Sequence, residues 1–148
     1  MKQTVRTYAY RAVFEAGDEF GLVVSFPDVP EAITQGEDRR DAIFQAEEAL
    51  GLALLSYARR GLPLPKARAS DRELVEIAVA PDVAAKLAML EAFAEADISK
   101  SELARRLGKD EKEIRRILDP FHPTKLVTLI AALAVLGRQL RVSMVNAA

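Results

Sequence analysis

The sequence contains no cysteine and a single histidine, His122, and this scarcity removes several classes of function at once. No disulfide can form. Zinc sites built from cysteine, or from cysteine with histidine, are excluded, as are thiol redox chemistry and cysteine nucleophiles. His122 lies in a loop between two prolines, where we interpret it as a solvated or phosphate-contacting side chain. The sequence therefore predicts no metal site and no cofactor, and it leaves carboxylates as the only plausible source of chemistry.

Long hydrophobic segments are also missing. The longest apolar run, from Leu126 to Gly137, covers about 12 residues, against the roughly 20 that a membrane-spanning helix requires. The first ten residues carry Lys2 and Arg6 and no apolar segment typical of a signal peptide. We therefore expect a cytoplasmic protein that does not enter a membrane.

The chain has 148 residues and a net charge of -1, but its charge is segregated. Residues 15–48 hold ten acids and two bases, whereas residues 99–125 hold eight bases and five acids. Opposite charges at two ends of a chain are typical of two different binding partners. The alternative is that both segments are ordinary solvated faces.

The first part of the chain alternates like β-structure. Period-two patterns predict strands over Thr7–Glu15, Leu22–Phe26, Ala32–Gln35 and Leu74–Val79. A helical period begins at Asp38, which can cap the helix, and stops at Arg60 and Gly61. The order βββαβ predicts an antiparallel sheet with the helix on one face, over a domain of residues 1–80.

The second part, residues 81–148, is helical. Ser99 and Glu102 form a capping-box pattern before one short helix, and Asp110 with Glu113 repeats it before the next. Gly108 allows the sharp turn between them, and Thr124 is expected to cap a fourth helix. The chain is thus α+β, and the two short helices predict a helix-turn-helix.

In a helix-turn-helix the second helix lies in the major groove of DNA. Lys112 and Arg115 are best placed to reach base edges, with Glu111 and Arg116 beside them. Lys100, Ser101, Thr124 and Lys125 stand at helix N-termini, where free amides favour phosphate. Helical hairpins that only pack are the alternative to this interpretation.

The tail, residues 138–145, alternates apolar and polar side chains and predicts a short C-terminal strand. One strand is not stable alone, so it must pair with an edge of its own chain or of a second copy. Pairing between copies would give the two-fold symmetry that a helix-turn-helix uses, so we expect a homodimer or a higher even oligomer.

The sequence resembles a known family over almost its whole length. Residues 10–15 (YRAVFE), 21–30 (GLVVSFPDVP), 33–36 (ITQG) and 46–50 (AEEAL) are similar to the antitoxin HicB. Residues 101–108 (SELARRLG), 116–120 (RILDP) and 124–126 (TKL) resemble the helix-turn-helix extension of one branch of that family, which is of the phage-repressor type.

The resemblance implies that residues 1–80 form a partly degraded ribonuclease H-like domain that sequesters HicA, a small basic ribonuclease toxin. The acidic segment suits such a partner. The helix-turn-helix would bind operator DNA and repress the protein's own operon. We assign toxin binding to Asp18, Glu19, Phe26, Asp28, Glu31, Glu37 and Asp38.

The chain departs from the family pattern at two places. Glu31-Ala32 stands where members often carry Gly-Cys, which adds a charge near the expected toxin contact. Asp110-Glu111 opens the second helix of the motif, where members usually carry serine and a basic or amide residue. Asp110 is explained as a cap. Glu111 could accept a hydrogen bond from cytosine or weaken the affinity for DNA.

Two rival functions belong to other classes. An active nuclease would need carboxylates clustered around two divalent metals, yet the strand positions that could converge carry Tyr8, Tyr10, Ala12, Leu22 and Val24. We therefore expect no enzymatic activity. A DNA-binding regulator whose first domain senses a small ligand remains open at this stage.

Overall fold

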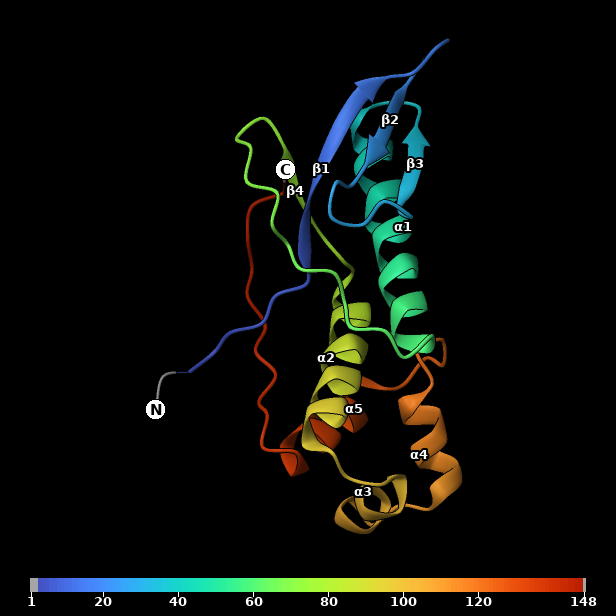
Figure 1. The fold of residues 1–148 in the computed structure, drawn as a ribbon, viewed down its shortest axis with the longest axis vertical. Helices are drawn as coiled ribbons and strands as arrows, with labels where there is room; N and C mark the ends of the chain where they lie inside the picture. The colour runs from blue at the N-terminus through green and yellow to red at the C-terminus, as the bar shows by residue number, and fades with distance from the viewer. Residues whose placement is uncertain (1–2, 148) are drawn as a thin grey trace. The chain divides into compact units, whose positions relative to one another are not determined.

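The fold was analysed in a computed structural model, which describes residues 3–147. These residues form one four-stranded sheet and five helices, so the expected α+β class is confirmed (Figure 1). The chain divides into two compact units, one ending at Leu87 and the other beginning at Ala88.

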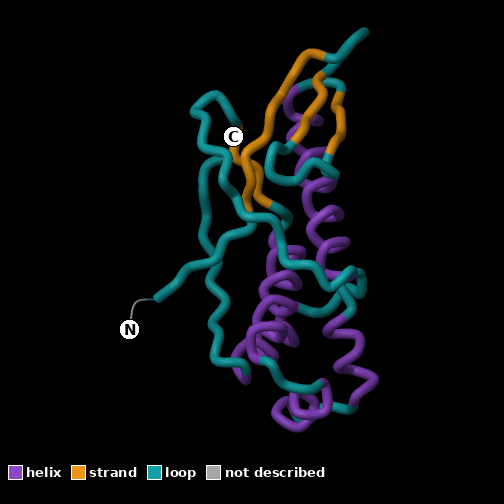
Figure 2. The backbone as a smooth tube through the Cα atoms, viewed as in Figure 1, coloured by secondary structure: helices purple, strands orange, loops and turns teal. Residues whose placement is uncertain are grey.

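The first unit contains an antiparallel sheet with the strand order β3-β2-β1-β4. The long central strand β1 (Ala9–Ala16) pairs with β4 (Val75–Ala78) through its first half and with β2 (Leu22–Ser25) through its second half. β3 (Ile33–Gly36) pairs with β2 and forms one edge of the sheet (Figure 2). All four strands lie within two residues of the ranges expected from the sequence.

Helix α1 (Arg39–Arg59) packs on one face of this sheet. It begins at the N-cap Asp38, whose side chain accepts the amide of Asp41 at 2.9 Å. It ends where Gly61 takes a positive φ of 68°, as expected for a glycine beyond a helix C-terminus. Its inner face carries small and branched residues that meet alternate strand residues. The core of this unit contains Tyr10, Ala12, Val24, Phe26, Ala42, Ala46, Leu50, Leu54 and Ile77.

Residues 62–74 connect α1 to β4 without regular structure, as Figure 2 shows by the loop colour. Two side chains of the sheet unit fix this segment. The Tyr10 hydroxyl donates to the carbonyl of Pro65, and the Asp28 carboxylate accepts the amides of Arg68 and Ala69, both at 2.8 Å. These hydrogen bonds therefore fix the connection at residues 65, 68 and 69, although it contains no helix or strand.

Four helices follow β4: α2 (Pro81–Ala96), α3 (Lys100–Leu107), α4 (Glu111–Leu118) and α5 (Leu126–Val135). The change from the first unit to the second falls inside α2. In the second unit α3 packs against both α4 and α5. The buried residues of this unit are Met89, Ala92, Leu103, Ala104, Ile114, Ile117, Leu129, Ala132 and Leu133.

Two expectations about this part of the chain were wrong. Residues 138–147 form no strand, and Val142 and Met144 are almost fully exposed, because a lone strand has no stability unless an edge pairs with it. Thr124 does not cap α5. The N-cap is Lys125, which makes no side-chain capping bond, and Thr124 lies one residue too early for the role.

No helix among residues 3–147 is both long enough and apolar enough to cross a bilayer. Even α1, the longest helix, carries charged residues at its start, its middle and its end.

Candidate functional site

The helices α3 and α4 are joined by a turn whose geometry follows from three residues. Ser99 caps α3 by accepting the amide of Glu102 at 3.0 Å, and Asp110 caps α4 by accepting the amide of Glu113 at 2.8 Å. Gly108 ends α3 with a φ of 66°, a left-handed conformation that glycine adopts without a Cβ clash. These capping and turn predictions are confirmed.

The reciprocal half of the first capping box does not form. The Glu102 carboxylate instead accepts hydrogen bonds from Arg105 at 2.6 Å and from Arg106 at 3.0 Å. Two guanidinium groups favour the ionised carboxylate, so they lower the pKa of Glu102 from 4.5 to about 2. Glu102 thereby neutralises part of the positive charge of α3.

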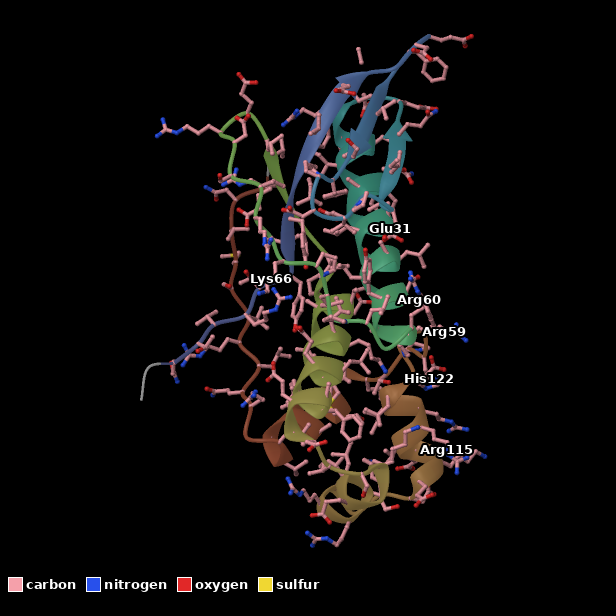
Figure 3. All side chains as sticks on the ribbon, viewed as in Figure 1. Glu31, Arg59, Arg60, Lys66, Arg115 and His122 are labelled. Atoms are coloured by element: carbon pink, nitrogen blue, oxygen red, sulfur yellow. The ribbon has the colours of Figure 1, made fainter. Side chains whose placement is uncertain are left out.

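The outward face of α4 is basic. Lys112, Arg115 and Arg116 are exposed, whereas Ile114 and Ile117 are buried. Arg115 extends from α4 into solvent with 68% of its side chain exposed (Figure 3). The side chains predicted to reach base edges therefore lie on an accessible face, as a groove-binding helix requires.

Glu111 connects α3 to this face. Its Oε1 atom accepts a hydrogen bond of 2.8 Å from the Ser101 hydroxyl, and its Oε2 atom lies 3.9 Å from a guanidinium nitrogen of Arg115. The first residue of α4 is thus positioned by one donor from α3 and one from the next turn of its own helix. Sequence reasoning had placed all three residues at the DNA surface but had not predicted these contacts.

The residues predicted to bind phosphate occupy two helix starts. Lys100 and Ser101 are the first residues of α3 and are exposed. Lys125 is the exposed N-cap of α5. The Thr124 hydroxyl donates to the carbonyl of His122 at 3.5 Å, so these two residues belong to the loop that precedes α5. Figure 3 labels His122 in this loop.

In the first unit, acidic side chains surround exposed apolar ones. Asp18, Glu19 and Glu37 are exposed, and Asp38 is exposed at the N-terminus of α1. The hairpin between β1 and β2 forms an open depression in which Asp18 and Glu19 lie beside Phe20. A second depression combines Asp38, Arg40, Asp41 and Phe44. These four predicted residues lie at the surface, where a partner could reach them.

Three other residues predicted to bind a partner make contacts within the chain. Phe26 is buried in the core. Asp28 holds the amides of the segment before β4. Glu31 accepts a hydrogen bond of 2.6 Å from the Tyr57 hydroxyl, which lowers the pKa of Glu31 and raises that of Tyr57. Glu31 is labelled beside α1 in Figure 3.

Sequence reasoning missed a stripe on the outer side of α1. Phe44, Glu48 and Leu52 follow one another at four-residue spacing and are all exposed, whereas Ala42, Ala46 and Leu50 form the buried stripe. The signal was present in the sequence, because Phe44 and Leu52 are apolar residues outside the buried stripe of the helix, and exposed apolar side chains indicate a second contact face. Glu47, between these stripes, has a pKa raised by partial burial and by the neighbouring charge of Glu48.

Comparison with known proteins gives a consistent result. The chain is 37% identical over 138 residues to the Antitoxin HicB of Escherichia coli K12, and the aligned region covers 92% of this chain and 99% of that protein. It is 34% identical over 139 residues to Antitoxin HicB 1 of Photorhabdus laumondii, with 94% of this chain and 88% of that protein covered. Antitoxin HicB 2 of the same organism is 38% identical over 125 residues, with 83% and 87% covered. No profile of a known protein family matches the chain.

Proposed function

The chain belongs to the HicB family of antitoxins, and from this we propose that it sequesters a HicA-type mRNA-cleaving toxin and represses its own operon by binding operator DNA. The first unit, which we propose is a degraded ribonuclease H-like fold, would hold the toxin. The α3–α4 pair would act as a helix-turn-helix. Both roles are binding roles, without catalysis by this chain.

One observation carries the proposal for the first unit. Glu15, Asp18, Glu19, Glu37 and Glu48 make no ion pair with any residue in the range 3–147. In the second unit, by contrast, the carboxylates of four glutamates pair with nearby arginines or lysine. They are Glu95, Glu102, Glu111 and Glu113. The uncompensated charge of the first unit is therefore available to an external cation.

A toxin that cleaves mRNA must attract a phosphate backbone, so its active face is positively charged. An acidic surface speeds the encounter with such a face and favours one orientation of the complex. The exposed apolar side chains Phe20, Phe44 and Leu52 among these acids would exclude water from the centre of the contact. Covering the toxin's active face would then block access of mRNA.

The α3–α4 pair supports the DNA-binding proposal by its geometry. The turn, the two caps and the burial of Ile114 and Ile117 fix α4 so that its basic face is turned to solvent. Lys112 and Arg115 would contact bases. Lys100 and Lys125, with the amides beside them, would contact phosphates.

We also propose that the protein acts as a homodimer through α5. Val127, Ile130, Ala131 and Ala134 form an exposed apolar stripe, with Val127 71% and Ile130 44% exposed. A stripe of small and branched residues allows two copies of a helix to approach closely about a two-fold axis. A dimer would present two copies of α4 to two half-sites of an operator.

Co-expression with the product of the neighbouring reading frame, which the proposal requires to be a small basic protein, tests the first role. We expect the two proteins to co-purify, native mass spectrometry to give a stable complex with even copy numbers, and RNA cleavage by the purified toxin to stop when this chain is added in equimolar amount. A toxin that remains active at tenfold excess of this chain would refute the proposal.

Electrophoretic mobility shifts test the second role separately. A duplex from the region upstream of the protein's own gene should bind more tightly than a random duplex of equal length by at least about a thousandfold. Equal affinity for both duplexes would refute specific operator binding and leave the toxin role unaffected.

A further inference from the structure

Glu111 occupies an unusual position for a carboxylate. It is the first residue of α4, exposed, at the end of the helix that would enter the groove. A free carboxylate there would be repelled by DNA phosphates, so its charge requires an explanation.

The contacts of Glu111 compensate this charge locally. The Ser101 hydroxyl donates to one carboxylate oxygen, Arg115 lies beside the other, and the positive end of the α4 dipole lies at the same place. A carboxylate accepts several hydrogen bonds, so these contacts leave lone pairs available on the exposed side. These contacts thus hold the Glu111 carboxylate in one orientation, and the ionised carboxylate can accept hydrogen bonds but cannot donate them.

The bases of DNA differ in what they offer to such a group. In the major groove guanine presents two acceptors, and thymine presents an acceptor and a methyl group. Adenine presents a donor next to an acceptor, which repels the second carboxylate oxygen. Cytosine presents a single amino donor, and it is therefore the base edge that an acceptor-only side chain fits best.

Arg115 follows Glu111 by four residues, which is about 6 Å along the helix axis and roughly two base-pair steps along the duplex. The arginine can donate to the two acceptors of guanine. The ion pair between the side chains keeps the acceptor and the donor adjacent before DNA is bound.

We propose that Glu111 is a specificity-determining residue that reads the amino group of a cytosine, within about two base pairs of a guanine read by Arg115, and that Ser101 is the residue that positions it. This inference rests on the proposed DNA binding and adds the base preference of one half-site. In this proposal Ser101 on α3 orients the Glu111 carboxylate at the start of α4, and the carboxylate contacts the base.

Selection from duplexes with a randomised central segment tests this assignment, using the full-length protein. The wild type should enrich cytosine at one position, with guanine within about two base pairs, by roughly tenfold over other bases. Glu111→Gln should replace cytosine by adenine at that position and keep the guanine, because an amide can donate to N7 and accept from N6 of adenine. Ser101→Ala should lower the enrichment of cytosine over the other bases at that position about threefold. Ser101→Thr keeps the hydroxyl and should have the same enrichment as the wild type.

Glu113→Gln is the matched control. It removes the same charge from the same helix, but Glu113 pairs with Lys109 at 3.5 Å and not with Arg115, so its selected site should equal that of the wild type. If Glu111→Gln selects the same bases as the wild type, the assignment of Glu111 is wrong while DNA binding stands. If the wild type enriches no sequence, specific DNA binding and this inference fail together.

Discussion

The carboxylate of Asp28 accepts the backbone amide of Arg68 at 2.8 Å, across forty residues of sequence. The same oxygen accepts the amide of Ala69. Asp28 lies between β2 and β3, and the two amides belong to the segment that leads into β4, so one side chain joins these two connections. The Asp28 carboxylate therefore has a structural role within the first unit.

We expect Asp28→Ala to lower the free energy of unfolding by about 1 to 2 kcal/mol, because two amides lose a charged acceptor at a partly exposed site. Urea denaturation followed by circular dichroism measures this loss. Asp18→Ala is the control, since exposed Asp18 makes no such contact, and it should change stability by less than about 0.5 kcal/mol. An Asp28→Ala variant as stable as the wild type would remove Asp28 from the structural residues.

Local signals predicted much of the fold. Asp38, Ser99 and Asp110 cap their helices, and Gly61 and Gly108 end them, because capping depends on residues only a few positions apart. The four strands were found by their alternation for the same reason.

Contacts between distant residues were not predictable in this way. No local pattern shows that the Asp28 carboxylate meets the amides of residues 68 and 69, or that Glu31 meets Tyr57 26 residues later. The alternation of residues 138–145 predicts a strand only where a neighbouring edge pairs with it, and residues 138–147 form no strand in the part of the chain that the structure describes. The caps and the turn between α3 and α4 were easier to predict because they lie on two consecutive helices, whereas the assignment of DNA-contacting residues stays a prediction.

Acid should weaken the second unit through Glu102. Its pKa in the folded chain is about 2, below the ordinary value of 4.5, so the stabilisation is complete above pH 4.5 and is lost as the pH falls toward 2. We expect Glu102→Gln to unfold with a smaller dependence on pH between 4.5 and 2 than the wild type, as measured by thermal melts across that range. An identical pH dependence in the two proteins would show that the carboxylate contributes no linkage.

Reversing one charge of the acidic surface should slow capture of a basic toxin. Glu19→Lys places a cation beside Phe20 on the exposed hairpin, and we expect it to lower the association rate several-fold at low salt, with a smaller difference at high salt. Surface plasmon resonance at two ionic strengths measures both effects. Glu73→Lys, an exposed acid outside this surface, is the matched control, and equal rates for the two variants would place the toxin interface elsewhere.

The two kinds of DNA contact should respond differently to mutation. Arg115→Ala removes a side chain that faces the bases, so it should weaken binding to the operator and leave binding to random duplex nearly unchanged. Lys125→Ala removes a cation at the start of α5, so it should weaken binding to both duplexes and reduce the salt dependence by about one ion. Equal losses on both duplexes from Arg115→Ala would show that Arg115 contacts phosphate and does not read a base.

Two surfaces compete as the site of dimerisation, and they make opposite predictions. The α5 stripe lies on a formed helix, whereas residues 138–147 have no regular structure and would have to adopt a strand on pairing, and fixing a backbone costs about 1 to 2 kcal/mol per residue. We therefore expect Ile130→Glu to give monomers in sedimentation velocity and to weaken operator binding, because one α4 then reads only one half-site. Val142→Glu places the same charge on the exposed tail and should remain a dimer; a monomer from Val142→Glu and a dimer from Ile130→Glu would assign the interface to the tail.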